Sequence, residues 1–189
     1  LGMSPVSAIA NIPEAIAGWD TETGYPNIGD DDYIGLVTMR RAIISSLNVA
    51  AARTLMEYVT PTVAAQYLIN LGVDASRVKA TGSGLALGTT GITPLEMAAA
   101  YAAIANGGTY VVPRLYLSAV DGDMHVLGRN ELVEEPIADE AAAYVLTNIM
   151  QGVLERGTAA SVRRAGYTRE AAGKTGTSNE TRDAWFVGS

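Results

Sequence analysis

The sequence contains no cysteine and only one histidine, His125, in 189 residues. Without cysteine, the chain can form neither a disulfide framework nor a thiolate metal site. A single histidine excludes a histidine-based zinc cluster and argues against a Ser-His-Asp triad. His125 also falls within a segment typical of a hairpin tip, 121–126, where we expect it to be solvated. We therefore predict no metal site and no cofactor.

Long apolar runs are also absent, since no stretch of about 20 apolar residues suggests a membrane span, and the chain does not open with a signal-peptide pattern. The 13 basic and 20 acidic residues give a net charge of −7, which argues against nucleic acid as a partner. A length of 189 residues is sufficient for one domain with a hydrophobic core.

The most informative segment is Gly173–Thr177, which places a cation, two hydroxyls and an unhindered backbone side by side. Short apolar runs flank it, and the polar turn 178–182 between them predicts a hairpin. On a strand, Lys174 and Gly176 face one way and Thr175 and Thr177 the other. Such an edge strand could bind an extended peptide through its backbone N–H groups, and Gly176 would allow close approach. The hydroxyls and the ammonium could bind a carboxylate.

A second polar element, Ser46-Leu47-Asn48, interrupts the helically spaced apolar residues of the segment 38–53. Serine and asparagine favour helix caps and turns over helix interiors. We therefore predict a helix–helix junction here, with Asn48 near the start of the second helix. Taken alone, each element has a purely structural interpretation: an ordinary cap for Ser46 and Asn48, and a solvated strand with a turn for the Lys-Thr-Gly segment.

The remaining sequence predicts a helix-rich domain with two strand pairs. Residues 1–35 are expected to be irregular and to cover the surface, and the glycine-rich segment 82–91 is expected to be a loop. Helices are predicted from Thr60-Pro61 to Gly72 and from the capping box at Thr93 to Asn106. Extended segments are predicted at 110–112 and 115–120. The helix 139–156 carries one apolar stripe that we assign to the core: Ala142, Val145, Leu146, Ile149, Val153 and Leu154.

Together these motifs resemble the transpeptidase domain of penicillin-binding proteins, most closely the class A, bifunctional type. Ser-x-x-Lys, a Ser-x-Asn element and Lys-Thr-Gly are the signatures of these enzymes and of class A β-lactamases. The resemblance covers nearly the whole chain. The matching segments, in order, are 46–48, 84–88, 93–98, 100–102, 105–108, 174–177 and 183–188. It implies an α/β (α+β) fold in which an antiparallel sheet is flanked by helices.

One family element is missing, because the nucleophilic serine of Ser-x-x-Lys should precede Ser46, and the first lysine is Lys79. The one Ser-x-x-Lys present, Ser76 to Lys79, follows Ser46 in a polar connection, so we do not take Ser76 as the nucleophile. We therefore expect residues 1–189 to be a partial transpeptidase domain that lacks the nucleophile and several strands, and to be inactive alone.

For the complete domain, the resemblance implies that a serine attacks the D-Ala-D-Ala bond of a peptidoglycan stem peptide. The acyl group then passes to an amine of a neighbouring peptide, and β-lactams block the enzyme. Ser46 would relay a proton, Asn48 would orient the substrate amide, and Lys174 would supply positive potential. Thr175 and Thr177 would bind the substrate carboxylate beside Gly176. The parent protein would lie at the extracytoplasmic face of the bacterial membrane, with its anchor outside this chain.

Three alternatives remain open at this stage. A class A β-lactamase shares the signatures, but no convincing Glu-x-x-Leu-Asn follows Asn48, and Asn130-Glu131-Leu132 has the wrong order. A non-catalytic binding platform for wall peptides would explain the missing serine, although Ser46, Asn48 and Lys174 are intact. A purely structural domain would require that all the motifs arise by coincidence.

Overall fold

Helices hold more residues than strands do in the computed structural model, which describes residues 3–13, 33–80, 82–178 and 183–189. The helical elements are α1 (Met39–Ile44), α2 (Asn48–Arg53), the π-helix η1 (Thr54–Val59), α3 (Pro61–Asn70), the 3₁₀ helix η2 (Ser83–Leu87), α4 (Pro94–Ala105), α5 (Glu140–Arg156) and α6 (Ala160–Arg164). The strands are β1 (Ala8–Asn11), β2 (Gly35–Thr38), β3 (Thr109–Val111), β4 (Ser118–Val120), β5 (Val126–Arg129), β6 (Glu134–Pro136), β7 (Gly173–Thr177) and β8 (Ala184–Gly188).

Two helix starts follow the capping signals in the sequence. At α3, the Thr60 hydroxyl accepts a hydrogen bond from the N–H of Val63, and Pro61 takes the first helical position. At α4, Thr93 and Glu96 form the predicted capping box. Both helices are confirmed. The prediction for residues 82–91 was wrong in one respect, because part of that segment forms the 3₁₀ helix η2.

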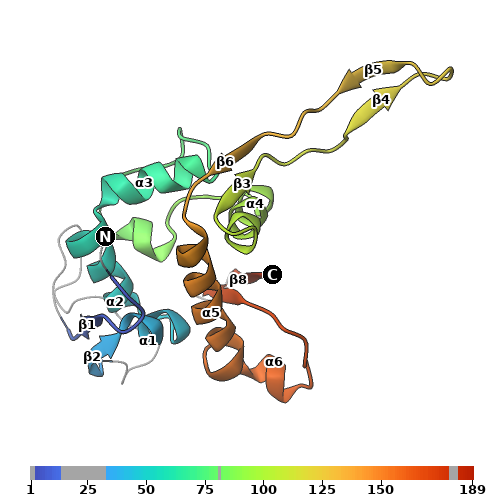
Figure 1. Ribbon diagram of the computed structural model, residues 1–189. Helices are drawn as coiled ribbons and strands as arrows, with labels where there is room; N and C mark the ends of the chain where they lie inside the picture. Colours follow the sequence, from blue (N-terminus) through green and yellow to red (C-terminus); the bar gives the residue numbers. More distant parts are fainter. Residues whose placement is uncertain (1–2, 14–32, 81, 179–182) are drawn as a thin grey trace.

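Helix α5 is the centre of the fold and lies between the α1–α2 pair and α4 (Figure 1). The Asp139 carboxylate caps it by accepting the N–H of Ala142 at 2.7 Å. Ile149, Val153 and Leu154 of the predicted stripe are buried. The assignment of Ala142 to the core was wrong, because Ala142 is exposed and its neighbour Ala143 is buried. The two differ by about 100° around the helix, and a run of alanines cannot show which one faces inward.

The described strands form four antiparallel pairs, β1–β2, β3–β6, β4–β5 and β7–β8. We had predicted two pairs. The irregular structure expected for residues 1–35 was wrong for Ala8–Asn11, which forms β1 on Gly35–Thr38. Ile9 and Asn11 on β1 are almost completely buried. Because the partner strand of β1 lies so far along the chain, no local sequence pattern marks this pairing. The predicted surface position of residues 14–32 lies outside the described residues.

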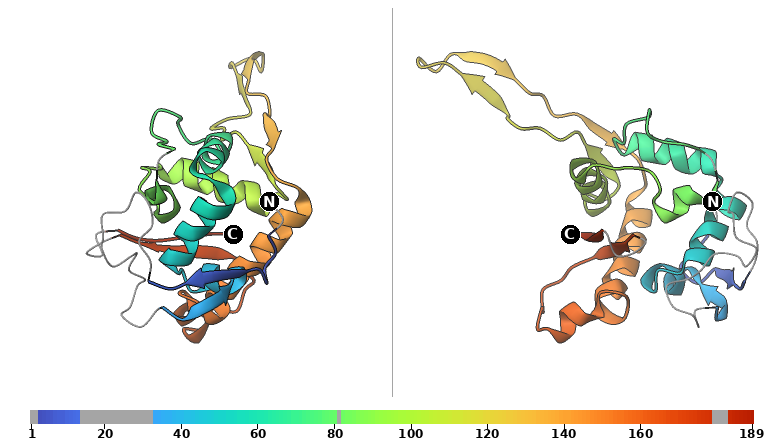
Figure 2. Two further views of the ribbon diagram at one scale, coloured as in Figure 1. Left: turned by 90° about the vertical axis from the view of Figure 1, so that its left-hand side faces the viewer. Right: turned by 180° about the vertical axis from the view of Figure 1, so that it is seen from behind.

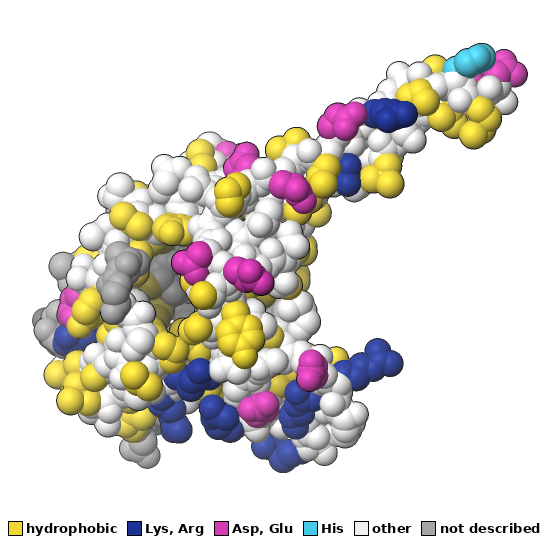
Figure 3. Space-filling model, viewed as in Figure 1, with side chains coloured by type: hydrophobic (Ala, Val, Ile, Leu, Met, Phe, Trp, Pro, Cys, Tyr) yellow, Lys and Arg dark blue, Asp and Glu magenta, His cyan; other side chains and the backbone are white. Residues whose placement is uncertain are grey.

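The β4–β5 hairpin projects from the body as a long arm (Figures 1 and 2). His125 lies at its tip with 77% of its side chain exposed (Figure 3), so the predicted solvated position is confirmed. Its Nδ1 lies 3.2 Å from the carboxylate of Asp121. No helix of the described ranges is both long and apolar enough to pass through a membrane.

Candidate active site

Ser46 lies in the two-helix junction that the sequence predicted. Helix α1 ends at Ile44 and α2 begins at Asn48. Ser46 has a φ of 55°, in the left-handed region, which for a non-glycine residue carries a cost of about 1–2 kcal/mol. Its N–H donates to the carbonyl of Ile43, and the N–H of buried Leu47 donates to the carbonyl of Ala42. Burial of Leu47 therefore anchors the junction that carries Ser46.

The predicted Lys-Thr-Gly hairpin is present as β7 and β8, paired from Gly173 with Gly188 to Thr177 with Ala184. Ala172 and Ser189 exchange both backbone hydrogen bonds at the end of this ladder, and the N–H of Ser178 donates to Asp183. Bonded and non-bonded pairs alternate in an antiparallel ladder. The N–H groups of Thr175 and Thr177 consequently point away from β8. Within the described part of the chain, β7 pairs only with β8, so these groups face an open edge.

The two elements meet at one contact, although 128 residues separate them. The Lys174 Nζ lies 2.7 Å from the Ser46 Oγ and 3.0 Å from the carbonyl oxygen of Thr175. Burial lowers the pKa of Lys174, because removal from water disfavours the ammonium form. Among the described residues, no carboxylate forms an ion pair with Lys174 that would offset this loss.

The other predicted site residues lie on the same two elements as Ser46 and Lys174. Asn48 is half-buried and begins α2, two residues after Ser46. Thr175 is half-buried, and its hydroxyl lies 2.5 Å from the hydroxyl of Thr158. Gly176 and Thr177 are exposed at the far end of β7. The structure therefore brings Ser46, Lys174 and Thr175 into one cluster of contacts and leaves Thr177 accessible on the open strand.

Sequence reasoning missed two residues that connect the site elements to α5 and to the turn after it. The Arg40 guanidinium on α1 donates to the Asn148 side-chain oxygen on α5 at 2.8 Å and to its carbonyl at 3.4 Å. Thr158, in the turn after α5, contacts Thr175 on β7. Arginine and threonine are common near helix ends, so neither residue carried a recognisable signal without the tertiary contacts.

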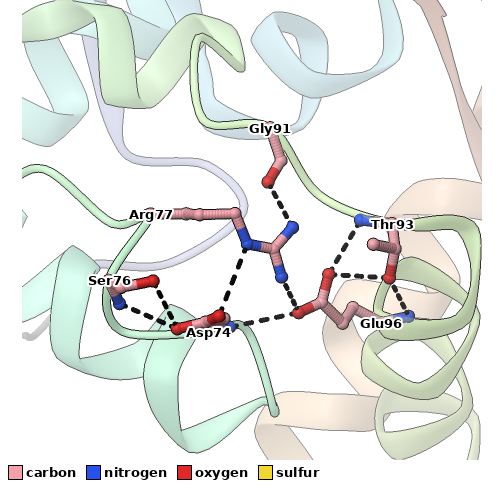
Figure 4. A network of polar contacts seen from close by, with 6 residues as sticks. All are labelled: Asp74, Ser76, Arg77, Gly91, Thr93 and Glu96. Carbon is pink, nitrogen blue, oxygen red and sulfur yellow. Dashed lines mark hydrogen bonds and ion pairs between the residues drawn. The ribbon is translucent and has the colours of Figure 1, made fainter.

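The alternative Ser-x-x-Lys segment has a structural role. The Ser76 hydroxyl donates to Asp74 at 2.8 Å, and Arg77 donates to the carbonyl of Gly91 and to Glu96. Figure 4 shows these groups holding the loop after α3 against the start of α4. Lys79 is exposed and takes no part in this network. In the described residues, no three histidine, cysteine, aspartate or glutamate side chains gather as a metal site would require.

The chain has the penicillin-binding and serine β-lactamase-like fold, and in it the Lys174 ammonium contacts the Ser46 hydroxyl beside the open edge of β7. The family model for the penicillin-binding protein transpeptidase domain matches residues 13–189. The chain therefore belongs to the penicillin-binding protein transpeptidase domain family.

The chain is similar to penicillin-binding protein 1A of Neisseria meningitidis serogroup A, with 34% identity over 195 residues. That alignment covers 99% of this chain and 24% of the relative, so the chain spans about a quarter of the length of the curated relatives it matches.

Among solved structures, penicillin-binding protein 1A from Haemophilus influenzae matches with a TM-score of 0.85 and 21% identity, covering 99% of this chain and 33% of that one. The imipenem acyl-enzyme complex of penicillin-binding protein A from M. tuberculosis matches with a TM-score of 0.77 and 20% identity, covering 99% and 47%. At these identities, the two matches establish the fold.

Proposed function

We propose that residues 1–189 form part of a D,D-transpeptidase domain that cross-links peptidoglycan by serine acyl transfer. The observation that carries the proposal is the 2.7 Å contact between Lys174 Nζ and Ser46 Oγ beside the open edge of β7. A stem peptide ending in D-Ala-D-Ala would lie along this edge as an added strand. The parent protein would act at the extracytoplasmic face of the membrane.

The family resemblance gives each residue a proposed role, and the position of each residue is compatible with it. Ser46 would carry a proton toward the leaving nitrogen, since a hydroxyl both donates and accepts. Lys174 would supply positive potential beside it, and Asn48 would orient the substrate amide. The hydroxyls of Thr175 and Thr177 would bind the terminal carboxylate, with Gly176 allowing close approach. The outward N–H of Thr177 would form half of the oxyanion hole, where one donor contributes about 3–4 kcal/mol to transition-state stabilisation.

The nucleophile is proposed to be a Ser-x-x-Lys serine that these 189 residues do not contain. Ser76 is a poor substitute, because its hydroxyl is bound to Asp74 and Lys79 is exposed. The acyl-enzyme would form on that serine and pass to an amine, which divides a difficult reaction into two easier steps. Alone, this chain is expected to form no stable penicillin adduct.

Two assays of the full-length parent protein test the proposal. The first is intact mass spectrometry after incubation with benzylpenicillin, and the second is the rate at which variants cross-link stem-peptide substrates. We expect a stable single adduct in the wild type. Ser46→Ala and Lys174→Ala should each slow cross-linking of stem-peptide substrates by at least about 100-fold, as expected for loss of a proton-transfer group. The sequence contains two lysines, so Lys79→Ala is the matched control and should retain the wild-type rate.

Other outcomes would support other functions. Rapid release of hydrolysed penicillin would identify a β-lactamase. Binding of wall peptides with neither adduct nor cross-linking would identify a non-catalytic platform. An adduct on this chain alone would contradict the proposed location of the nucleophile, and peptide mapping would identify the modified serine.

A further inference from the structure

The turn after α5 contacts both elements that build the site. The N–H of Thr158 donates to the carbonyl of Ile44 at 3.4 Å, two residues before Ser46. The Thr158 hydroxyl lies 2.5 Å from the Thr175 hydroxyl, one residue after Lys174. A single residue outside the predicted site is thus hydrogen-bonded to both sides of the Ser46–Lys174 contact.

This turn has a rigid base. Ala159 is almost fully buried with Val153 and Leu154, and its N–H donates to the carbonyl of Val153 at 3.0 Å. On the other side, a Cβ on Gly157 would lie 2.4 Å from the carbonyl oxygen of Ile44, so the two backbones are in direct contact. Thr158 is held between these two anchors.

Hydroxyl chemistry determines which of the two threonines donates in this contact when substrate is bound. Each hydroxyl has one proton to donate and can accept from another donor. If Thr175 donates its proton to a substrate carboxylate, its oxygen must accept the proton of Thr158. Hydrogen bonds arranged in such a chain polarise and strengthen one another. Thr158 thus makes Thr175 a better donor without touching the substrate.

We propose that Thr158 is a positioning residue, which orients the Thr175 hydroxyl as a donor to the substrate carboxylate and holds β7 in register with the Ser46 junction. This inference rests on the proposed transpeptidase function. It predicts that loss of the Thr158 hydroxyl weakens reactions of carboxylate-bearing substrates and spares those of substrates without the carboxylate.

The test compares Thr158→Val with wild type in the full-length parent protein, because valine preserves the shape and the backbone N–H. Acylation by benzylpenicillin should slow about tenfold, the effect of one hydrogen bond of about 1.4 kcal/mol. Acylation by benzylpenicillin methyl ester, which lacks the charged carboxylate, should change less than about twofold by the same reasoning. Thr158→Ser should restore most of the benzylpenicillin rate. The control is Thr147→Val on α5, because the Thr147 hydroxyl bonds only to the Ala143 carbonyl of its own helix among the described contacts.

The outcomes separate the two proposals. A wild type that is never acylated removes the proposed function and this inference with it. If the wild type is acylated and Thr158→Val reacts equally fast, the Thr158 inference alone is wrong. An equal loss with benzylpenicillin and with its ester would also overturn it, since that result shows general damage to the fold. A loss confined to benzylpenicillin and restored by serine supports it.

Discussion

Replacing Gly157 with alanine should separate Ser46 from Lys174 by pushing two backbones apart. Gly157 has a φ of −110°, so alanine introduces no backbone strain there. Its Cβ, however, would lie 2.4 Å from the carbonyl oxygen of Ile44, and reaching an ordinary 3.4 Å contact requires a shift of about 1 Å. Ser46 lies two residues beyond Ile44. Its 2.7 Å contact with Lys174 would then lengthen to about 3.7 Å, beyond hydrogen-bonding range.

Two quantities should change together in Gly157→Ala. Overpacking should lower the free energy of unfolding by about 1–3 kcal/mol, measured by urea denaturation. A displacement of about 1 Å at the proposed proton-transfer groups should slow cross-linking by the full-length parent protein about 100-fold, measured with stem-peptide substrates.

Gly152→Ala is the matched control for this variant. Its added Cβ would also meet Ile44, but 2.5 Å from the Cδ1 at the end of the side chain and not from backbone. Alanine is favoured over glycine inside a helix by up to about 1 kcal/mol, which offsets part of the repacking. Gly152→Ala should therefore cross-link within a fewfold of wild type. A wild-type cross-linking rate in Gly157→Ala, or an equal loss of activity in both variants, would show that the contact with the Ile44 carbonyl does not control the Ser46–Lys174 distance.

Three further predictions concern the stability of the fold. The backbone and hydroxyl of Thr93, with smaller contributions from Asp74 and Arg77, hold the pKa of Glu96 at about 2, below the ordinary 4.5. A lowered folded-state pKa stabilises the protein above pH 4.5 and loses that effect as the pH falls toward 2, so Glu96→Gln should flatten the pH dependence of urea unfolding in this window. Ala143→Asp should lower the thermal midpoint sharply while Ala142→Asp leaves it near wild type, because only Ala143 is buried. Val153→Ala should lower the free energy of unfolding by about 2 kcal/mol, because Val153 is completely buried; a change below about 0.5 kcal/mol would place it outside the core.

What the sequence could predict depended on whether the signal was local. The capping residues Thr60, Thr93 and Asp139 start α3, α4 and α5 because a cap acts within one turn of its own helix. Strands β7 and β8 lie close together in the sequence, so their pairing was predictable as well; the predicted turn falls largely on residues 179–182, outside the described residues. Strand β1 was missed because its partner strand begins only at Gly35, too far along the chain for a turn signal to link the two.

The residues of the candidate site also divide into those with a sequence signal and those without one. Ser46 and Lys174 carry motif signals, and the structure brings their side chains into contact, while their catalytic roles stay predictions. The roles proposed for Asn48, Thr175 and Thr177 remain predictions. Arg40 and Thr158 could not be found, because their partners, Asn148 and Thr175, are defined only by how α5 packs against α1 and β7.

Two unfavourable features coincide at the Ser46–Lys174 contact, and their coincidence bears on the direction of proton transfer. Ser46 is in the left-handed region and Lys174 is removed from water. Strain of this kind persists where the surrounding structure fixes the residue, and it gathers at functional sites. A charged Lys174 can only donate to Ser46, so the Ser46 proton stays available for a third group. A neutral Lys174 would instead accept that proton. Burial lowers the pKa of Lys174 and so brings its neutral form closer in energy, which is the property that the proposed relay would use.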